Sequence, residues 1–159
     1  MYTQLSKNVD ALSTAFNAPV NKDLVIRRFQ IGTVDACVFY IEGMCKEDLL
    51  DQFVLLPAMR QARNTRLDIK TLLGDIIAVS NAKPETDQKK LEEAILDGQC
   101  ALLWEGSSEA LVLDIRGYEH RSISQPSTEN VILGSQEGFT ENIRTNVTLV
   151  RRMVRSTAL

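Results

Sequence analysis

The sequence predicts a single α+β lobe, in which a mixed β-sheet built from two hairpins is packed by helices, followed by a long C-terminal connecting helix. Three observations indicate this fold class. Two pairs of extended apolar runs are each divided by a turn-forming segment, helical periodicity occurs before and between them, and an amphipathic stripe about four turns long follows near the C-terminus. The 159 residues fit one domain, and their 44% hydrophobic content is enough for a core.

The N-terminal part begins with a helix and continues into a hairpin. Apolar residues recur at helical spacing over residues 6–16, which predicts a short amphipathic helix there. Two extended runs flank residues 32–35, so residues 24–41 are predicted to form a β-hairpin. The second run, residues 36–41, shows no polar alternation, which is typical of a strand covered on both faces.

The middle of the chain is predicted to be mainly helical. Residues 46–64 have apolar residues at helical spacing, but Pro57 lacks a backbone donor and predicts a break or kink. A further short helix is predicted for residues 67–73, whereas residues 76–79 are β-rich but too short for an assignment. The composition of residues 83–87 predicts a loop.

The second hairpin is the clearest local feature. A helix is predicted for residues 88–96, ended by Gly98, and residues 100–115 then contain two apolar runs around the turn at residues 106–108. Neither run has a polar face, so the sheet is predicted to be buried on both sides. The residues expected in the core are Val38, Phe39, Ile41, Leu102, Leu103, Leu111 and Leu113.

The C-terminal part is predicted to be a loop followed by a helix. Residues 118–133 show no periodicity, whereas a helix is predicted to start after Gly134 with Ser135 as its N-cap. This divides the chain into a lobe at residues 1–134 and a connecting helix at residues 135–159. We expect the C-terminal half of this helix to project, because its apolar stripe is longer than a small lobe covers. The stripe is predicted to contain Phe139, Ile143, Val147, Val150 and Val154.

Basic residues flank this stripe. The last twenty residues are net positive in a chain whose formal net charge is −3. Arg144, Arg151 and Arg155 fall within about 40° on the helical wheel. They form either a solvated face whose stems cover apolar surface or a contact stripe for acidic protein or lipid headgroups. Asn146 lies at the margin of the apolar stripe, where its amide is expected to fix the helix register rather than bind a ligand.

Composition and motifs argue against several function classes. The near-neutral charge is not that of a nucleic-acid binder, and no stretch resembles a signal peptide or a membrane span. Three cysteines at unrelated spacings and a single histidine, His120, argue against a disulfide scaffold, a zinc site or a catalytic triad. Glycine-rich phosphate-binding motifs do not occur. We therefore expect a soluble chain with no cofactor, no metal and no enzymatic activity.

Residues 125–152 resemble a known family. They fit a pattern of the form E-P-x-T-E-x-V-x-x-G-P-x-E-G-F-T-E, followed by R-T-N-x-x-L-I-R-R, of the A subunits of bacterial spore germinant receptors, the GerA family. The matching residues are Pro126, Thr128, Glu129, Gly134, Glu137, Gly138, Phe139, Glu141, Arg144, Thr145, Asn146, Leu149, Arg151 and Arg152. The chain departs from the family at Leu133, Ser135 and Gln136. Strand–glycine and helix–glycine signatures upstream extend the resemblance to about residues 24–155.

The resemblance implies the first lobe of a hydrophilic N-terminal portion, which in the family continues into a second lobe and then into a multi-helix membrane region. It implies a role in nutrient-triggered signalling, with B- and C-type receptor subunits, and other A subunits, as partners. The implied location is the spore inner membrane, with this domain on the cytoplasmic, core-facing side and membrane contact only through spans outside this chain. The related stage V sporulation A-type proteins fit the pattern as well.

Two hypotheses of different classes follow. In the first, the lobe is a non-enzymatic interaction and signal-coupling module, with partner contacts at Arg144, Val150, Arg151, Val154 and Arg155. In the second, a polar cleft of the lobe binds the small-molecule germinant directly. An exposed apolar stripe favours the first, and convergent polar side chains in a cleft favour the second. Structural roles are expected for the motif residues Pro126, Glu129, Gly134, Glu137, Gly138, Phe139, Glu141 and Asn146.

Overall fold

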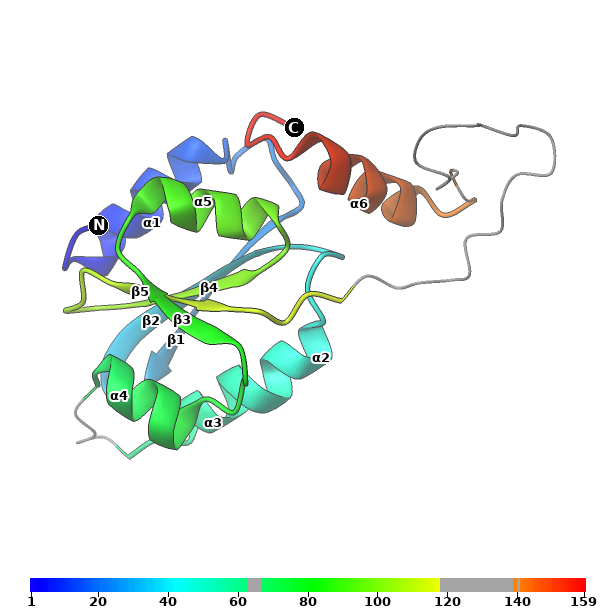
Figure 1. Ribbon diagram of the computed structural model, residues 1–159. Coiled ribbons are helices and arrows are strands. Elements are labelled where there is room, and N and C mark those ends of the chain that lie inside the picture. Colours follow the sequence, from blue (N-terminus) through cyan, green and yellow to red (C-terminus); the bar gives the residue numbers. More distant parts are fainter. Residues whose placement is uncertain (63–66, 118–138, 140) are drawn as a thin grey trace.

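Helices cover both faces of one five-stranded sheet (Figure 1). The structure is a computed structural model that describes residues 1–62, 67–117, 139 and 141–159. The α+β fold class is confirmed, with one difference in the sheet. All four strand pairings are antiparallel, where the sequence predicts a mixed sheet.

Two hairpins form the centre of the sheet, as predicted. In spatial order the strands are β1 (Leu24–Ile31), β2 (Val34–Ile41), β4 (Cys100–Trp104), β5 (Ala110–Leu113) and β3 (Ala82–Glu85). β1 pairs with β2, β4 pairs with β5, and the pairing of β2 with β4 joins the two hairpins. The first turn is shorter than predicted, because Ile31 pairs with Val34 and leaves only Gly32 and Thr33 between them. Gly32 has a φ of 63°, which glycine adopts at little cost.

Strand β3 replaces a predicted loop. The sequence predicts a loop at residues 83–87, yet Ala82–Glu85 pairs with β5 at one edge of the sheet. Pro84 lies in this strand and has no backbone N–H. An edge strand tolerates proline because it needs to pair on one side only. The β-rich residues 76–79 do not form a strand.

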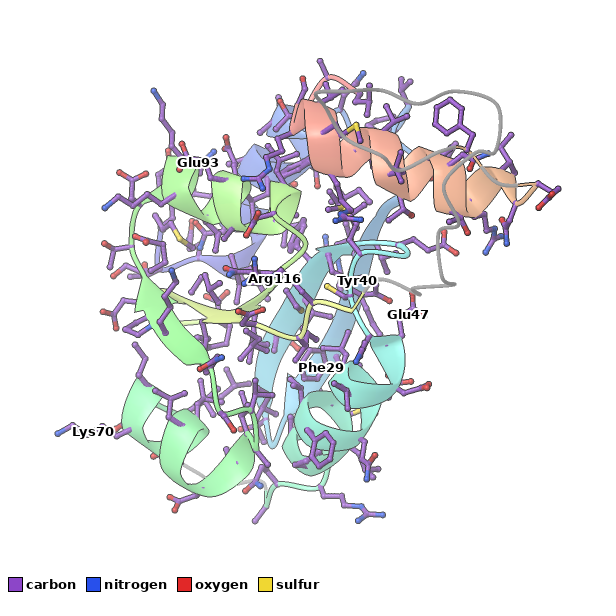
Figure 2. All side chains as sticks on the ribbon, turned by 45° about the vertical axis from the view of Figure 1, so that its right-hand side comes forward. Phe29, Tyr40, Glu47, Lys70, Glu93 and Arg116 are labelled. Carbon is purple, nitrogen blue, oxygen red and sulfur yellow. The ribbon has the colours of Figure 1, made fainter. Side chains whose placement is uncertain are left out.

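The helices are divided between the two faces of the sheet. Helices α1 (Leu5–Ala15) and α5 (Gln88–Leu96) pack on one face, close to their predicted bounds. The other face is covered by α2 (Glu47–Leu50), η1 (Asp51–Leu55), α3 (Leu56–Met59), α4 (Ile69–Thr71) and η2 (Leu72–Ile76), where η denotes a π-helical turn. Lys70 on α4 and Glu93 on α5 lie on opposite outer sides of the molecule (Figure 2).

Pro57 does not break the helix in which it lies. The helical segments α2, η1 and α3 follow one another from Glu47 to Met59, with a π-helical turn just before the proline. Because Pro57 has no N–H, the Phe53 carbonyl lacks its α-helical donor. It accepts a hydrogen bond from the Ala78 backbone N at 3.2 Å instead. The freed carbonyl thereby connects this helix to the segment that follows η2.

The strands contribute to two separate cores, one on each face. Successive residues of a strand point to opposite faces. Val38 and Leu102 therefore belong to the core under α2–η2, whereas Phe39 and Leu103 belong to the core under α1 and α5. The seven residues predicted to be buried are all at most 1% exposed, so this prediction is confirmed.

The three cysteines, Cys37, Cys45 and Cys100, are free and buried in these cores. Desolvation by burial raises the pKa of Cys37 and of Cys45 to about 12. It raises the pKa of Cys100 well above its ordinary value. The thiols therefore stay protonated and behave as small hydrophobic groups rather than nucleophiles.

Replacing Leu103 by alanine tests the two-sided core. The side chain is 1% exposed, so Leu103→Ala removes buried methyl groups and leaves a cavity. We expect the free energy of unfolding to fall by about 2–5 kcal/mol in urea titrations. The exposed Leu56, at 46% exposure, provides the matched control. A loss below about 0.5 kcal/mol for Leu103→Ala would place this residue outside the core.

Thiol labelling tests the burial of the cysteines. We expect Ellman's reagent to label the thiols of the folded protein only slowly at mildly alkaline pH, because thiolate is scarce and the sulfurs are inaccessible. All three should react rapidly in guanidinium chloride. Fast stoichiometric labelling of any one thiol under native conditions would contradict the buried position of that residue.

Candidate functional site

The terminal helix α6 (Ile143–Val154) is the candidate functional element. Its N-cap is Asn142, whose side-chain oxygen accepts a hydrogen bond from the Arg144 backbone N at 3.0 Å. Its C-cap is Arg155, which has a left-handed conformation with a φ of 46°. Such caps are usually glycine or asparagine, so an arginine here is uncommon.

The helix begins later than predicted, and its C-terminal half does not project as predicted but lies against the lobe through the buried Arg151. Phe139 is not helical, although the sequence predicts a helix from Ser135. Ser135 itself lies outside the described residues. The asparagine cap at Asn142 explains the observed start, because its short side chain satisfies a backbone donor of the first turn. Phe139 is 72% exposed and Glu141 is also exposed.

The apolar side of α6 faces away from the lobe. We define the outer stripe as Ile143, Val147, Val150 and Val154. Ile143, Val147 and Val154 are 75%, 39% and 51% exposed, and Val150 is half-buried. Leu149 and Arg151 are the buried residues of the helix. On a helical wheel Thr148 and Arg152 lie opposite the stripe. The side of α6 that contacts the lobe is therefore largely polar.

Two exposed ion pairs connect the ends of α6 to the lobe. Arg144 Nη1 lies 2.9 Å from Glu42 Oε1, at the end of β2. Arg155 Nη2 lies 3.1 Å from Asp97 Oδ1, at the C-cap of α5. The Arg144 and Arg155 side chains remain 82% and 63% exposed, so solvent screens these pairs and each contributes little stability.

A third contact, in the last turn of the helix and between the two exposed pairs, has a buried arginine. The Arg151 side chain is 8% exposed, and its Nη2 lies 2.8 Å from Asp23 Oδ2. It also donates through Nε to Asp23 Oδ2 and through Nη2 to Asn21 Oδ1, both at 2.9 Å. A charge-assisted pair that is shielded from water in this way is stronger than the pairs at the ends.

Glycine allows the helix to approach the lobe closely. Gly43 follows β2 and has a φ of 78°. A Cβ atom at this position would lie 2.8 Å from Thr148 Oγ1 on α6, closer than side chains tolerate. The absence of a side chain at Gly43 thus makes room for the helix.

A hollow of about 210 Å³ lies between α6 and the lobe. Its charged lining residues are Asp97, Arg116, Arg152 and Arg155, and Met44, Leu96 and Met153 complete it. Arg116 (Figure 2) binds Asp114 through two hydrogen bonds of 2.7 Å and also pairs with Asp97. The hydrogen bond from Arg116 lowers the pKa of Asp114. Carboxylates thus neutralise much of the arginine charge beside the hollow.

The structure does not describe all the residues that the sequence analysis selects. His120 and the motif residues Pro126, Glu129, Gly134, Glu137 and Gly138 lie outside the described residues. Asn146 is half-buried on α6, and its expected structural role remains a prediction. Among residues 1–62, 67–117, 139 and 141–159, no three His, Cys, Asp or Glu side chains group as metal ligands. Within the same ranges, no helix is long and apolar enough to cross a bilayer.

The lobe residues that hold α6 are not recognisable from the sequence. Asn21, Asp23, Glu42 and Asp97 lie in turns or at the ends of elements, and no sequence pattern assigns any of them a contact with the terminal helix. The grouping of arginines on one side of the helical wheel is a signal that acidic partners exist. It does not identify them, because Asp23 and Arg151 are brought together only by the fold. The predicted partner contact of these arginines stays a prediction.

Comparison with known proteins gives consistent results. The family model described as "Bacillus/Clostridium GerA spore germination protein" matches residues 10–159. The chain is 34% identical to the uncharacterized membrane protein YfkQ of Bacillus subtilis over 135 residues, covering 84% of this chain and 26% of that protein. It is 29% identical to spore germination protein KA of the same organism over 157 residues, covering 96% of this chain and 28% of that protein. The chain thus spans about a quarter of the length of both relatives.

A solved structure has the same fold. It is the N-terminal domain of the A subunit of the Bacillus megaterium spore germinant receptor GerK3, with a TM-score of 0.72 and 22% sequence identity. The match covers 99% of this chain and 57% of that one. The family model covers nearly the whole chain, including every described residue of α6. The chain therefore belongs to the GerA family of Bacillus/Clostridium spore germination proteins.

Proposed function

We propose that this chain is an N-terminal region of a spore germinant receptor A subunit and acts there as a non-enzymatic interaction and signal-coupling module. The observation that carries this proposal is the outer stripe of α6, which turns apolar side chains to solvent. Exposed apolar residues that are contiguous on a helix are typical of contact surfaces. Family membership and the fold of the GerK3 domain support the receptor context.

The partner proposed for the outer stripe is another part of the receptor. B- and C-type subunits or other A subunits are the candidates, and the proposed setting is the cytoplasmic side of the spore inner membrane. Val150 and Val154 form the apolar part of the proposed contact, and Arg144, Arg151 and Arg155 flank it. These arginines already pair with carboxylates of their own chain. The valines, rather than the arginine charges, are therefore the proposed source of affinity.

Substituting the outer stripe tests this contact. Val147→Asp combined with Val154→Asp places charges on side chains that are exposed, so the lobe should keep its melting temperature within a few degrees. We expect spores that carry the double variant to germinate several-fold more slowly with nutrients, because a charge in an apolar interface is strongly unfavourable. The matched control is Lys70→Asp combined with Glu93→Lys, on the outer faces of α4 and α5. Normal germination of the stripe variant would contradict the proposal.

Direct binding of the germinant is the second candidate function. The hollow beside Arg116 favours it, because guanidinium groups, carboxylates and apolar side chains converge there. A small zwitterion with an apolar group would suit this lining.

Ligand-observed NMR distinguishes the two functions. Under the coupling proposal we expect no saturation transfer to candidate amino acids or sugars from the 159-residue chain. A transfer signal that disappears in Arg155→Gln, but persists in the control Arg27→Gln, would establish binding in the hollow. That result would favour the second function over the first.

A further inference from the structure

Charged contacts, rather than apolar burial, attach α6 to the lobe. Helix α6 buries a single apolar residue, Leu149, whereas α1 buries three and α5 buries two. Of the described residues, those of α6 belong to neither hydrophobic core. Hydrophobic stabilisation scales with the apolar area removed from water, so α6 gains little from it. The cores, in turn, are complete without the helix.

The buried Arg151 strengthens the attachment of α6 and also makes it sensitive to the charge of Asp23. Asn21 Oδ1 accepts from the Asp23 backbone N at 3.2 Å, so the two residues that hold the guanidinium also hold each other. If Asp23 loses its charge, a buried guanidinium is left without a counterion, which is strongly unfavourable. In a helix that belongs to a core, the free-energy cost of the unpaired guanidinium would destabilise the whole fold. In α6 this cost is avoided when the helix leaves the lobe, because Arg151 is then hydrated again.

We propose that α6 is a detachable strap, held on the lobe by an electrostatic clasp. The clasp consists of the central Arg151–Asp23–Asn21 contact and the outer pairs Arg144–Glu42 and Arg155–Asp97. When the clasp opens, α6 separates while the lobe stays folded. A free helix of 12 residues is marginal in water, so the detached segment also unwinds.

The clasp arginines lie about 90° from the outer stripe on the helical wheel, so Ile143, Val147 and Val154 stay exposed while the clasp is closed. A partner that binds the stripe can therefore bind α6 while it is attached to the lobe, or stabilise it in the separated state, without disturbing either core. The strap itself does not rest on the proposed receptor contact, because every group of the clasp belongs to this chain.

Hydrogen exchange of the 159-residue chain, measured by NMR, tests the strap. We compare the unsubstituted chain with Asp23→Asn, which removes the central carboxylate charge. Protection of the amides from Val147 to Val154 should fall at least tenfold in the variant, and that of β2 and β4 should stay within twofold. The control is Asp51→Asn, which opens the exposed Arg27–Asp51 pair on the lobe and should leave α6 unchanged.

Two further measurements keep the test decisive. Leu149→Ala removes the apolar side chain that α6 buries and should reduce α6 protection less than Asp23→Asn does. In the unsubstituted chain, raising the salt from about 0.01 M to about 1 M shortens the screening length from about 30 Å to about 3 Å. This should lower α6 protection selectively but less than Asp23→Asn does, because salt screens the exposed outer pairs more than the buried Arg151. The salt series remains informative if Asp23→Asn does not fold.

The strap is overturned by any of three results. In the first, α6 and the strands lose protection together in Asp23→Asn. In the second, α6 protection is unaffected by both the variant and salt. In the third, Leu149→Ala releases the helix more than Asp23→Asn, which would make the attachment apolar.

Discussion

Burial of both faces of an antiparallel sheet is the constraint on which this structure depends. Strands β2, β4 and β5 have almost no polar position, so water must be excluded from each side. The chain meets this requirement with α1 and α5 on one face and the segments from α2 to η2 on the other. The cysteines become unreactive as a consequence, because they lie inside those two layers.

The same constraint explains why α6 exposes its apolar side. With both faces of the sheet already covered, little apolar surface remains on the lobe for a further amphipathic helix. Helix α6 therefore meets the lobe through Arg144, Arg151 and Arg155, and Val147 and Val154 remain exposed to solvent. A helix held by charges and exposing an apolar stripe suits a contact element better than a part of the core. The proposals for partner contact and for a detachable strap both follow from this arrangement.

Irregular backbone in the lobe has local physical causes. Pro57 has no N–H and so frees the Phe53 carbonyl, which accepts a hydrogen bond from the Ala78 backbone N and joins two helical segments. Thr148 approaches the Gly43 backbone so closely that a Cβ atom at this position would clash with the threonine hydroxyl. Proline and glycine here create contacts between segments distant in sequence, so a purely local interpretation as helix breaker or strand end is incomplete.

The sequence by itself determined the two hairpins, helices α1 and α5 and the two-sided core, because apolar periodicity and turn residues are local signals. It also determined that α6 has an apolar stripe beside arginines. Only the tertiary structure decided that β3 is an edge strand despite Pro84, since pairing with β5 outweighs local loop propensity. The tertiary structure alone also decided which way α6 faces. The partners of Arg151, Asn21 and Asp23, lie about 130 residues away in sequence, and no local pattern encodes a charge pair formed across that separation.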